Sequence, residues 1–533
     1  MSVNQDYRYR SLAGVILLVT SILVFAVVYF LLAVHADIPL LDGDDAVYVL
    51  MADYFSPFSE RSSAITELVM RHSRFPPFYP LVLGMLGVDS SHLAAMHAVT
   101  VAFLLGAMAM LFLWARQVSE SAVWAALAAM LFGLLPVTVH QSFGILSENL
   151  YLLLSLLAIW CTVRDRRDER WLIITAIVIA LACFSRSLGF ALLLAWLICL
   201  RQVPLLERIR LGLIALMPTF VWNIWKLAHG YHGDYSDSLL DGLRGGMLSD
   251  LLQVHARAPW LSLWNGWITS FDADPSIVTL VVGSVVGMMC LVGTLYRATQ
   301  WKVDGVYVIV YLLVILVWPY TYEARRFLYP VLPVLLVHGC LWLTALPHKR
   351  IDLRMAAAYP YVYLAIMALI AFPAVATMAE RFMQSRTSGE HMYALSPSWY
   401  GYGNREEART RAAEQMALVR AWRDLKNIVR EGQCVYHVKP VALMLYADRP
   451  SYVPPLVGEE NYGDLLQRAS QCRYFYLGAY TYYPYLSPFY PQRYLSDSRV
   501  VQTHYLEGPG DRRVLGYLVE PRRDTVPIKP NKE

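Results

Sequence analysis

The residues that best suit chemistry follow the first apolar segment of the chain. Four carboxylates, those of Asp37, Asp42, Asp44 and Asp45, fall within nine residues of DIPLLDGDDAVYVLMADYF. Carboxylates this close together repel one another, and such a group suits a general base or a cation site. A solvated acidic loop, with Asp44 or Asp45 capping an amphipathic helix at the membrane interface, is the alternative interpretation.

A basic group stands later in the same loop. In RHSRFPPFYPLVLGMLG, Arg71, His72 and Arg74 precede Pro76 and Pro77, which fix an extended turn before an apolar helix. At headgroup depth such residues can hold a lipid phosphate, and arginine can do so through two hydrogen bonds. The alternative is that these long side chains only extend their charged ends to the membrane interface and bind no ligand.

Three more polar groups stand at the ends of apolar runs. They are His140, Ser147, Glu148 and Asn149 in HQSFGILSENLYLLL, Arg186 in SRSLGF, and Glu323, Arg325 and Arg326 in YTYEARRFLYPVLPVLL. An ionisable residue at the edge of a membrane bundle is costly, which makes it a functional candidate. Together with the aspartates, these residues predict a cluster of acids and arginines that suits a reaction on a membrane-anchored anionic substrate.

The elements that must position these residues are membrane helices. The chain has 533 residues, 57% of them apolar and 16% charged. Soluble domains carry about a quarter charged residues, so the composition excludes a soluble enzyme. A spanning helix needs about 20 apolar residues. We expect eleven spans, at 12–34, 93–115, 122–139, 149–163, 171–185, 187–200, 211–228, 276–296, 305–320, 327–346 and 356–378.

The placement of charge predicts topology and domains. Every second loop is short and basic, and the positive-inside rule places these loops and the N terminus in the cytoplasm. This alternation favours two short spans for 171–200, with one long tilted helix or a re-entrant pair as the alternatives. The loop 35–92 then lies outside. Residues 379–533 hold 38 of the 86 charged residues, so 1–378 is predicted to be a membrane module and 379–533 a soluble external domain.

The C-terminal domain is predicted to be α/β or α+β. A charged stretch at 404–430 has apolar residues at helical spacing, and short runs such as CVYHV, LMLYA, RYFYLGAY and RVLGYLVE are typical of strands. This domain could bind an acceptor or only support the outer face. Cys434 and Cys472 form a disulfide if the domain is in an oxidising compartment, and two buried thiols are the alternative.

The motifs, in this order, resemble the GT-C glycosyltransferase superfamily. The similarity covers about 12–346 and is greatest to the bacterial branch related to dolichyl-phosphate-mannose–protein mannosyltransferases and to the aminoarabinose transferase of lipid A. It is carried by GDDAVYVLMADYF, RFPPFYPLVLGML, LSENLYLLL, SRSLGF and RRFLYPVLP. The resemblance implies an inverting transfer of a sugar from a polyprenyl phosphate, such as undecaprenyl phosphate, to a periplasmic lipid, glycan or protein at the bacterial inner membrane.

The resemblance also implies roles for individual residues. Asp44 and Asp45, with Tyr48, match the family's acidic motif, whose acid acts as base or binds the acceptor. Arg74 corresponds to the family's phosphate-binding residue, although Phe75 separates it from the prolines, whereas the aminoarabinose branch has a lysine directly before them. Arg186 and Arg325–Arg326 match donor-binding positions.

Some members of the superfamily use a divalent cation, and Mg²⁺ or Mn²⁺ would here fall to Asp42 and Asp44.

Two other classes compete with a transferase. A transporter or flippase for a lipid-linked sugar tends to have duplicated halves and charges near the membrane midplane, which this chain does not display. A non-catalytic membrane scaffold predicts that Asp44→Ala leaves the phenotype unchanged. The net charge of +4 gives no case for nucleic acid. The donor sugar, the acceptor and the oligomeric state stay open.

Overall fold

The computed structural model describes most of the chain. Its description leaves out residues 1, 35–43, 60–61, 73, 165–167, 230–258, 273–274, 319–322, 346–352, 389–404, 454–470, 479–497, 509–510 and 522–533. Asp37 and Asp42 therefore lie outside the described residues.

The first 388 residues form a helical bundle with a helical outer loop. Its helices are α1 Ser2–Val34, α2 Asp44–Phe55, α3 Ser63–Arg71, α4 Phe78–Met85, α5 Leu93–Ser119, α6 Ala122–Leu134, α7 Pro136–Phe143, α8 Glu148–Thr162, α9 Glu169–Ser185, α10 Gly189–Cys199, α11 Leu205–Ala228, α14 Pro259–Thr269, α15 Ile277–Thr299, α16 Val303–Leu316, α17 Ala324–Leu328, α18 Leu332–Ala345 and α19 Leu353–Ser388. A short 3₁₀ turn, Tyr329–Val331, joins α17 to α18.

Each of the eleven predicted apolar runs falls on a helix, but the expected number of spans is not confirmed. In the described part of the chain, six helices are long and apolar enough to cross a membrane, or seven if the bent pair α6 and α7 counts as one span. The difference is one of length. The helices α8, α9, α10 and α16 have 15, 17, 11 and 14 residues, whereas about 20 are needed to cross a 30 Å hydrocarbon core.

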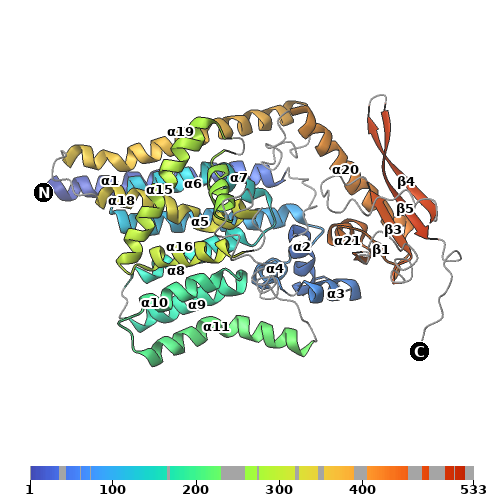
Figure 1. The fold of residues 1–533 in the computed structure, drawn as a ribbon, viewed down its shortest axis with the longest axis horizontal. Coiled ribbons are helices and arrows are strands. Elements are labelled where there is room, and N and C mark those ends of the chain that lie inside the picture. The colour runs from blue at the N-terminus through green and yellow to red at the C-terminus, as the bar shows by residue number, and fades with distance from the viewer. Residues whose placement is uncertain are drawn as a thin grey trace.

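The long helices run side by side (Figure 1), and several of them carry exposed apolar side chains. Leu206 on α11, Ile277 on α15 and Leu369 on α19 are 80%, 79% and 71% exposed. Large exposed apolar surfaces are unfavourable in water and suit contact with lipid. The fold is therefore that of a multi-pass membrane protein.

The basic loops gather at one end of the bundle. Glu169, Arg201 and Trp301, from the junctions α8–α9, α10–α11 and α15–α16, line one cavity, and Arg116 donates a hydrogen bond to Ser11 near the start of α1. Figure 1 places the N terminus at this end and the C-terminal domain at the opposite end.

The first outer loop packs into the protein. The helix α2 begins at Asp44, as its acidic residues predict, because acidic side chains stabilise the first turn of a helix. Residues 46–53 are buried, and α4 lies against this helix so closely that a Cβ at Gly84 would be 2.6 Å from the Ala52 carbonyl. The prediction that α2 is amphipathic, with one face exposed, is therefore wrong: protein covers both of its faces.

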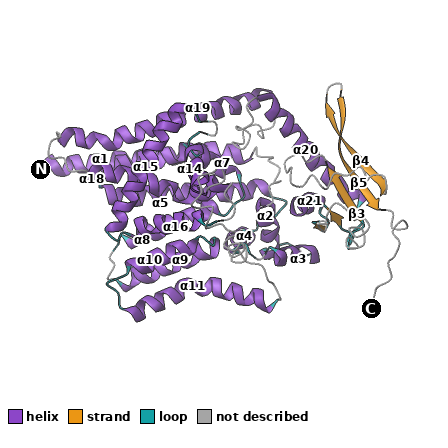
Figure 2. Cartoon of the chain, viewed as in Figure 1, coloured by secondary structure: helices purple, strands orange, loops and turns teal. Residues whose placement is uncertain are grey.

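The C-terminal domain combines two helices with a mixed sheet (Figure 2). Its elements are α20 Arg405–Ile428, β1 Val435–Tyr436, α21 Pro440–Ala447, β2 Ser451–Tyr452, β3 Tyr474–Gly478, β4 Ser498–Gly508 and β5 Asp511–Pro521. The strand order is β2-β1-β3-β5-β4, with parallel pairs around β1 and antiparallel pairs at β5. Cys434 and Cys472 form a disulfide that joins the starts of β1 and β3.

One predicted strand of this domain is wrong. LMLYA lies in α21, which begins at Pro440 and ends at Asp448 in a left-handed conformation. Proline at the first helical position favours a helix start, and a short apolar run does not by itself distinguish a buried helix from a strand.

Candidate active site

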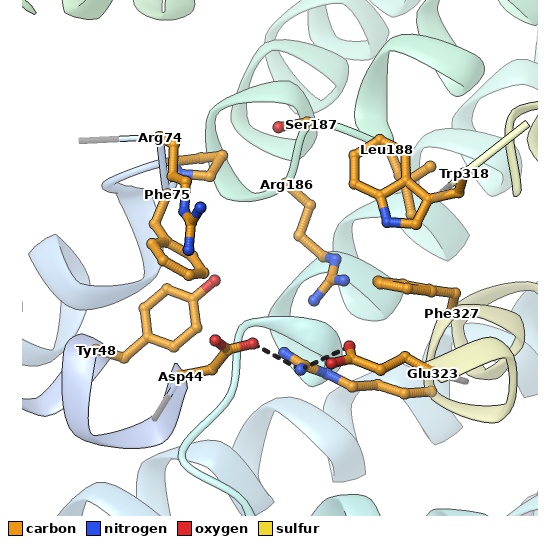
Figure 3. A pocket seen from close by; sticks show the side chains of 12 residues that line it. Asp44, Tyr48, Arg74, Phe75, Arg186, Ser187, Leu188, Trp318, Glu323 and Phe327 are labelled. Carbon is orange, nitrogen blue, oxygen red and sulfur yellow. Dashed lines mark hydrogen bonds and ion pairs between the residues drawn. The ribbon is translucent and has the colours of Figure 1, made fainter. Parts of the chain in front are cut away.

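A cavity of about 200 Å³ lies where the outer loop meets the ends of the bundle helices. Its wall comes from four separate parts of the chain. The lining residues are Asp44, Tyr48, Arg74, Phe75, Pro76, Arg186, Ser187, Leu188, Trp318, Glu323, Arg326 and Phe327. Figure 3 shows Arg186 and Asp44 pointing toward the centre from different elements. Six of the residues predicted from sequence are thus brought together: Asp44, Tyr48, Arg74, Arg186, Glu323 and Arg326.

Arg326 is held by three carboxylates. Its Nη1 lies 2.6 Å from Asp44 Oδ2 and 3.2 Å from Glu323 Oε2, and its Nε pairs with Glu148. Burial raises the pKa of Glu323, although the nearby guanidinium of Arg326 opposes this shift. Arginine stays charged at any accessible pH, so the base of the cavity holds a fixed cation.

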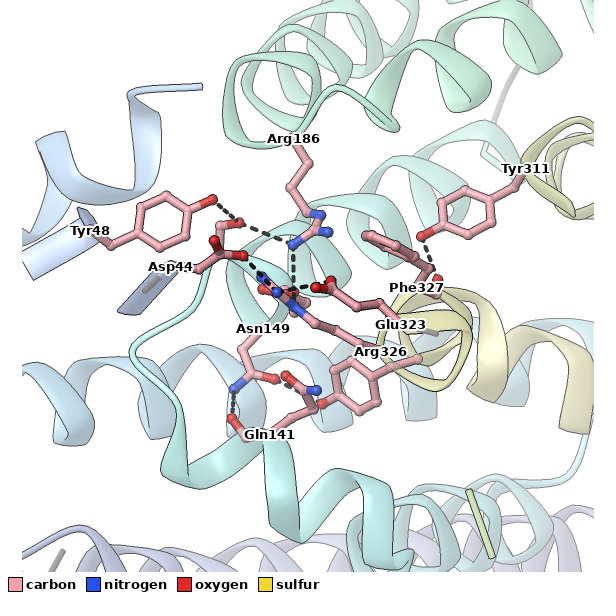
Figure 4. A network of polar contacts seen from close by, with 12 residues as sticks. Asp44, Tyr48, Gln141, Asn149, Arg186, Tyr311, Glu323, Arg326 and Phe327 are labelled. Atoms are coloured by element: carbon pink, nitrogen blue, oxygen red, sulfur yellow. Dashed lines mark hydrogen bonds and ion pairs between the residues drawn. The ribbon is translucent and has the colours of Figure 1, made fainter. Parts of the chain in front are cut away.

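Glu148 connects the two arginines of the cavity. Its side chain is 0% exposed, and its Oε1 lies 2.7 Å from Arg186 Nη1 while also accepting from Arg326. Figure 4 shows Arg186 and Arg326 within this polar network. Arg186 also donates to Ser147 Oγ at 3.2 Å, and Tyr48 OH lies 3.0 Å from the same oxygen. A carboxylate between two guanidinium groups fixes both without leaving a buried charge unpaired.

The break between α9 and α10 places Arg186. This residue caps the C-terminal end of α9 with φ −151° and ψ 142°. In this extended conformation its side chain no longer follows the helical arrangement of α9. The break confirms two helices in place of one long helix over 171–200.

An aromatic wall closes the side formed by the outer loop. The ring of Tyr48 makes edge contacts with Phe75 and Tyr79 at centroid distances of 5.6 and 5.3 Å. Arg74 lies over Phe75, with its Cζ 5.4 Å from the ring centroid. Phe75, which separates Arg74 from the prolines, is therefore part of the aromatic wall, and the guanidinium of Arg74 packs against its ring.

Several other predicted residues do not line this cavity, among them Glu148, which lies behind the two arginines. Asp45 follows Asp44 on α2 and is half-buried, His140 is half-buried in α7, and His72 ends α3. Arg325 precedes Arg326, but its backbone packs against α14, where a Cβ at Gly266 would be 2.8 Å from Arg325 N. Successive helical residues point about 100° apart, so Asp45 and Arg325 point in other directions than their cavity-lining neighbours.

The described residues do not fit a divalent cation at this place. Among them, no group of three or more His, Cys, Asp or Glu side chains is arranged to hold a metal ion. The carboxylates of Asp44, Glu148 and Glu323 converge on Arg326 instead. The oxygens that a cation would need are bound by a guanidinium, which already supplies positive charge.

Sequence reasoning did not single out part of the wall. Ser187, Leu188 and Phe327 lie within the quoted motifs but were not singled out as site residues, and Trp318 lies outside these motifs; all four line the cavity. Trp318 and Phe327 contact each other edge to face at 6.0 Å. An aromatic residue at the end of an apolar run is also typical of a membrane interface, so this signal could not have identified them.

Comparison with known proteins identifies the fold. No protein-family model and no curated protein sequence matches the chain. The crystal structure of ArnT from Cupriavidus metallidurans in the apo state matches with a TM-score of 0.50 and 12% identity, over 94% of this chain and 97% of that chain. The chain is therefore similar to a GT-C glycosyltransferase over almost its whole length and has the GT-C fold.

Two further structures match with lower scores. ArnT from the same organism bound to undecaprenyl phosphate has a TM-score of 0.45 and 12% identity, over 93% of this chain and 97% of that chain. The archaeal oligosaccharyltransferase AglB from Archaeoglobus fulgidus, in complex with an inhibitory peptide and a dolichol-phosphate, has a TM-score of 0.48 and 13% identity, over 95% of this chain and 75% of that chain.

Proposed function

We propose that this protein is an inverting glycosyltransferase that moves a sugar from a polyprenyl phosphate to an acceptor at the outer face of the bacterial inner membrane. The observation that carries the proposal is that one cavity contains a carboxylate, Asp44, and two arginines on other walls, Arg74 and Arg186. The reaction needs a base for the acceptor and positive charge for the leaving phosphate. The GT-C fold supports the same class of reaction.

Asp44 is the proposed base. The acceptor hydroxyl oxygen attacks the anomeric carbon, the bond from that carbon to the phosphate oxygen breaks with its electron pair, and the hydroxyl proton passes to Asp44. One displacement inverts the anomeric configuration and releases sugar-free polyprenyl phosphate. Asp44 suits this role because its side chain is 34% exposed within the cavity while Arg326 holds its carboxylate at 2.6 Å. Positioned proton transfer contributes about 10²–10⁴-fold to a rate.

Arg186 and Arg74 are the proposed phosphate ligands. Negative charge develops on the phosphate as the bond breaks, and preplaced donors in a site with little water stabilise it without reorganisation. Arg326 has the different role of a positioning residue. Because Arg326 is paired with Asp44, Glu148 and Glu323, it orients the base and does not bind the donor.

The proposed orientation rests on charge and on the disulfide. The basic loops gather at the end of the bundle opposite the cavity, as expected for the cytoplasmic side. The Cys434–Cys472 disulfide suits an oxidising compartment, which agrees with a periplasmic C-terminal domain.

A transfer assay on the purified full-length protein tests this function. Polyprenyl-phosphate sugars extracted from the host membrane are supplied with lipid, glycan and protein acceptors, and released polyprenyl phosphate is measured. Wild type should release it only with an acceptor. Asp44→Asn should lower the rate at least about 100-fold, whereas Asp45→Asn, the matched control on the same helix, should retain most of it.

Two results would contradict the proposal. Well-folded wild type that releases nothing with any acceptor would favour a transporter or a scaffold. Release that is unchanged in Asp44→Asn would leave a transferase with a different base.

A further inference from the structure

A second cavity lies between the outer loop and the C-terminal domain. It has a volume of about 320 Å³ and is lined on one side by α3 and the turn that follows it, and on the other by α21 and β2. Arg74 lines both this cavity and the one that contains Asp44. The two cavities therefore share a wall.

The contact between α3 and β2 fixes an arginine at the second cavity. Tyr452 OH donates to Glu67 Oε2 at 2.6 Å, and Arg71 Nη2 lies 2.5 Å from Glu67 Oε1. The Arg71 Cζ is also 4.3 Å from the centroid of the Tyr452 ring. A guanidinium held by both a carboxylate and an aromatic face loses little further entropy when it binds a ligand.

The polar side of the second cavity is cationic. Among the described residues that line it, two arginines, Arg71 and Arg74, accompany one carboxylate, Glu67, which is shared by Arg71 and Tyr452. His72 Nδ1 lies 3.0 Å from the Leu68 carbonyl oxygen. Burial lowers the pKa of His72, so the ring is neutral at neutral pH and its Nδ1 donates to that carbonyl. The Nε2 atom is then an acceptor that suits a ligand hydroxyl.

The opposite side of the second cavity is apolar. Val441 and Met444 from α21 and Val453 after β2 line it. The ring face of a sugar is apolar, whereas its hydroxyls and any acidic substituent are polar. A cavity with one cationic side and one apolar side therefore matches a saccharide that carries a carboxylate or a phosphate.

We propose that this second cavity is the acceptor subsite and that the acceptor is an anionic saccharide, either free or attached to a lipid. Its acidic group binds Arg71, its ring packs on Met444, and the reacting hydroxyl passes Arg74 toward Asp44. The C-terminal domain thus recognises the acceptor instead of only covering the membrane module. The assignment of the bound saccharide as an acceptor rests on the proposed transferase function. The binding of an anionic saccharide in this cavity does not.

Binding can be tested apart from transfer. Saturation-transfer difference NMR on the full-length protein compares glucose 6-phosphate with glucose. Wild type should bind the phosphorylated probe in preference. Met444→Trp, which fills the second cavity, and Arg71→Gln should lose at least tenfold in affinity. Arg473→Gln is the matched control, because Arg473 is 49% exposed and paired with a glutamate, against 47% for Arg71.

A further variant separates the two cavities. Arg186 lines the first cavity only, so Arg186→Gln should keep probe binding. Equal binding of glucose and glucose 6-phosphate, or wild-type affinity in Met444→Trp and Arg71→Gln with unchanged melting temperatures, would overturn the inference.

Kinetics then identify the source of the saccharide and separate this inference from the proposed function. At saturating donor, Met444→Trp should raise the acceptor KM at least tenfold with the donor KM unchanged. Lower KM for a lipid-linked acidic saccharide than for the free one assigns a lipid acceptor, and the reverse assigns a soluble glycan. Preference for a peptide acceptor contradicts the inference. Selective probe binding without any transfer supports the subsite and contradicts only the transferase.

Discussion

Glu148 offers the sharpest test of how the cavity is held together. Glu148→Gln keeps the shape of the side chain and removes its charge. Two opposite charges about 4 Å apart attract by about 4 kcal/mol at an effective dielectric constant of about 20, and Glu148 has two such partners, Arg186 and Arg326. The cost of burying these charges offsets part of this attraction. Breaking a buried ion pair from one side costs about 3–5 kcal/mol net.

We therefore expect Glu148→Gln to lower the free energy of unfolding by about 3–5 kcal/mol. The rate should fall as well, because the released Arg186 no longer meets the leaving phosphate. Loss of one preplaced donor costs about 10²–10³-fold in kcat. The melting temperature of the purified protein and the release of polyprenyl phosphate measure the two effects.

Two companion variants separate the causes. Glu169→Gln is the control, because Glu169 is 66% exposed and pairs with Arg210 at 2.7 Å on the surface, where screening by water leaves little stability to lose. Combining Glu148→Gln with Arg186→Gln removes one of the uncompensated buried charges, so it should restore part of the stability but none of the activity. Wild-type melting temperature and wild-type kcat in Glu148→Gln would refute this account of the site.

Three other perturbations have definite expected outcomes. Replacing both Cys434 and Cys472 by serine should destabilise the C-terminal domain by about 4 kcal/mol in thermal melting. The reason is that a disulfide between residues 38 apart no longer restricts the unfolded chain. A chelator should leave kcat unchanged, while Arg326→Met should lower it by disorienting Asp44. Burial lowers the pKa of His437 to about 4, from about 6.5 in unfolded chains. The folded domain thus favours the neutral ring, and about 3 kcal/mol of stability should be lost as the pH falls from 6.5 to 4.

Each of these outcomes has its own control. A thiol reductant should lower the melting temperature of wild type but not of the double serine variant. Loss of activity in chelator that returns with Mg²⁺ or Mn²⁺ would contradict the assignment of Arg326 as the fixed cation. The melting temperature of His437→Gln should depend less on pH than that of wild type, and identical pH profiles would exclude His437 as the cause.

The sequence by itself determined the local features of this protein. Apolar runs fixed where the bundle helices lie, and the acidic pair at Asp44 fixed the start of α2. The pattern of α20 and of strands β3 and β5 was also predictable, because each of these elements shows its own periodicity. Arginines that end or follow apolar runs were recognisable as site candidates, since charge at a membrane edge is costly.

Tertiary structure decided what these local features do. Asp44 rather than Asp45 lines the cavity because of how α2 is rotated against α4 and α3, and a motif containing both residues cannot convey that rotation. Arg326 pairs with Glu148 and Asp44, which lie 178 and 282 residues away in the sequence. The second cavity depends on β2 meeting α3, which lie 385 residues apart at Tyr452 and Glu67. Single-sequence patterns describe neighbours within a helix or strand, whereas these pairings arise only when distant elements pack together.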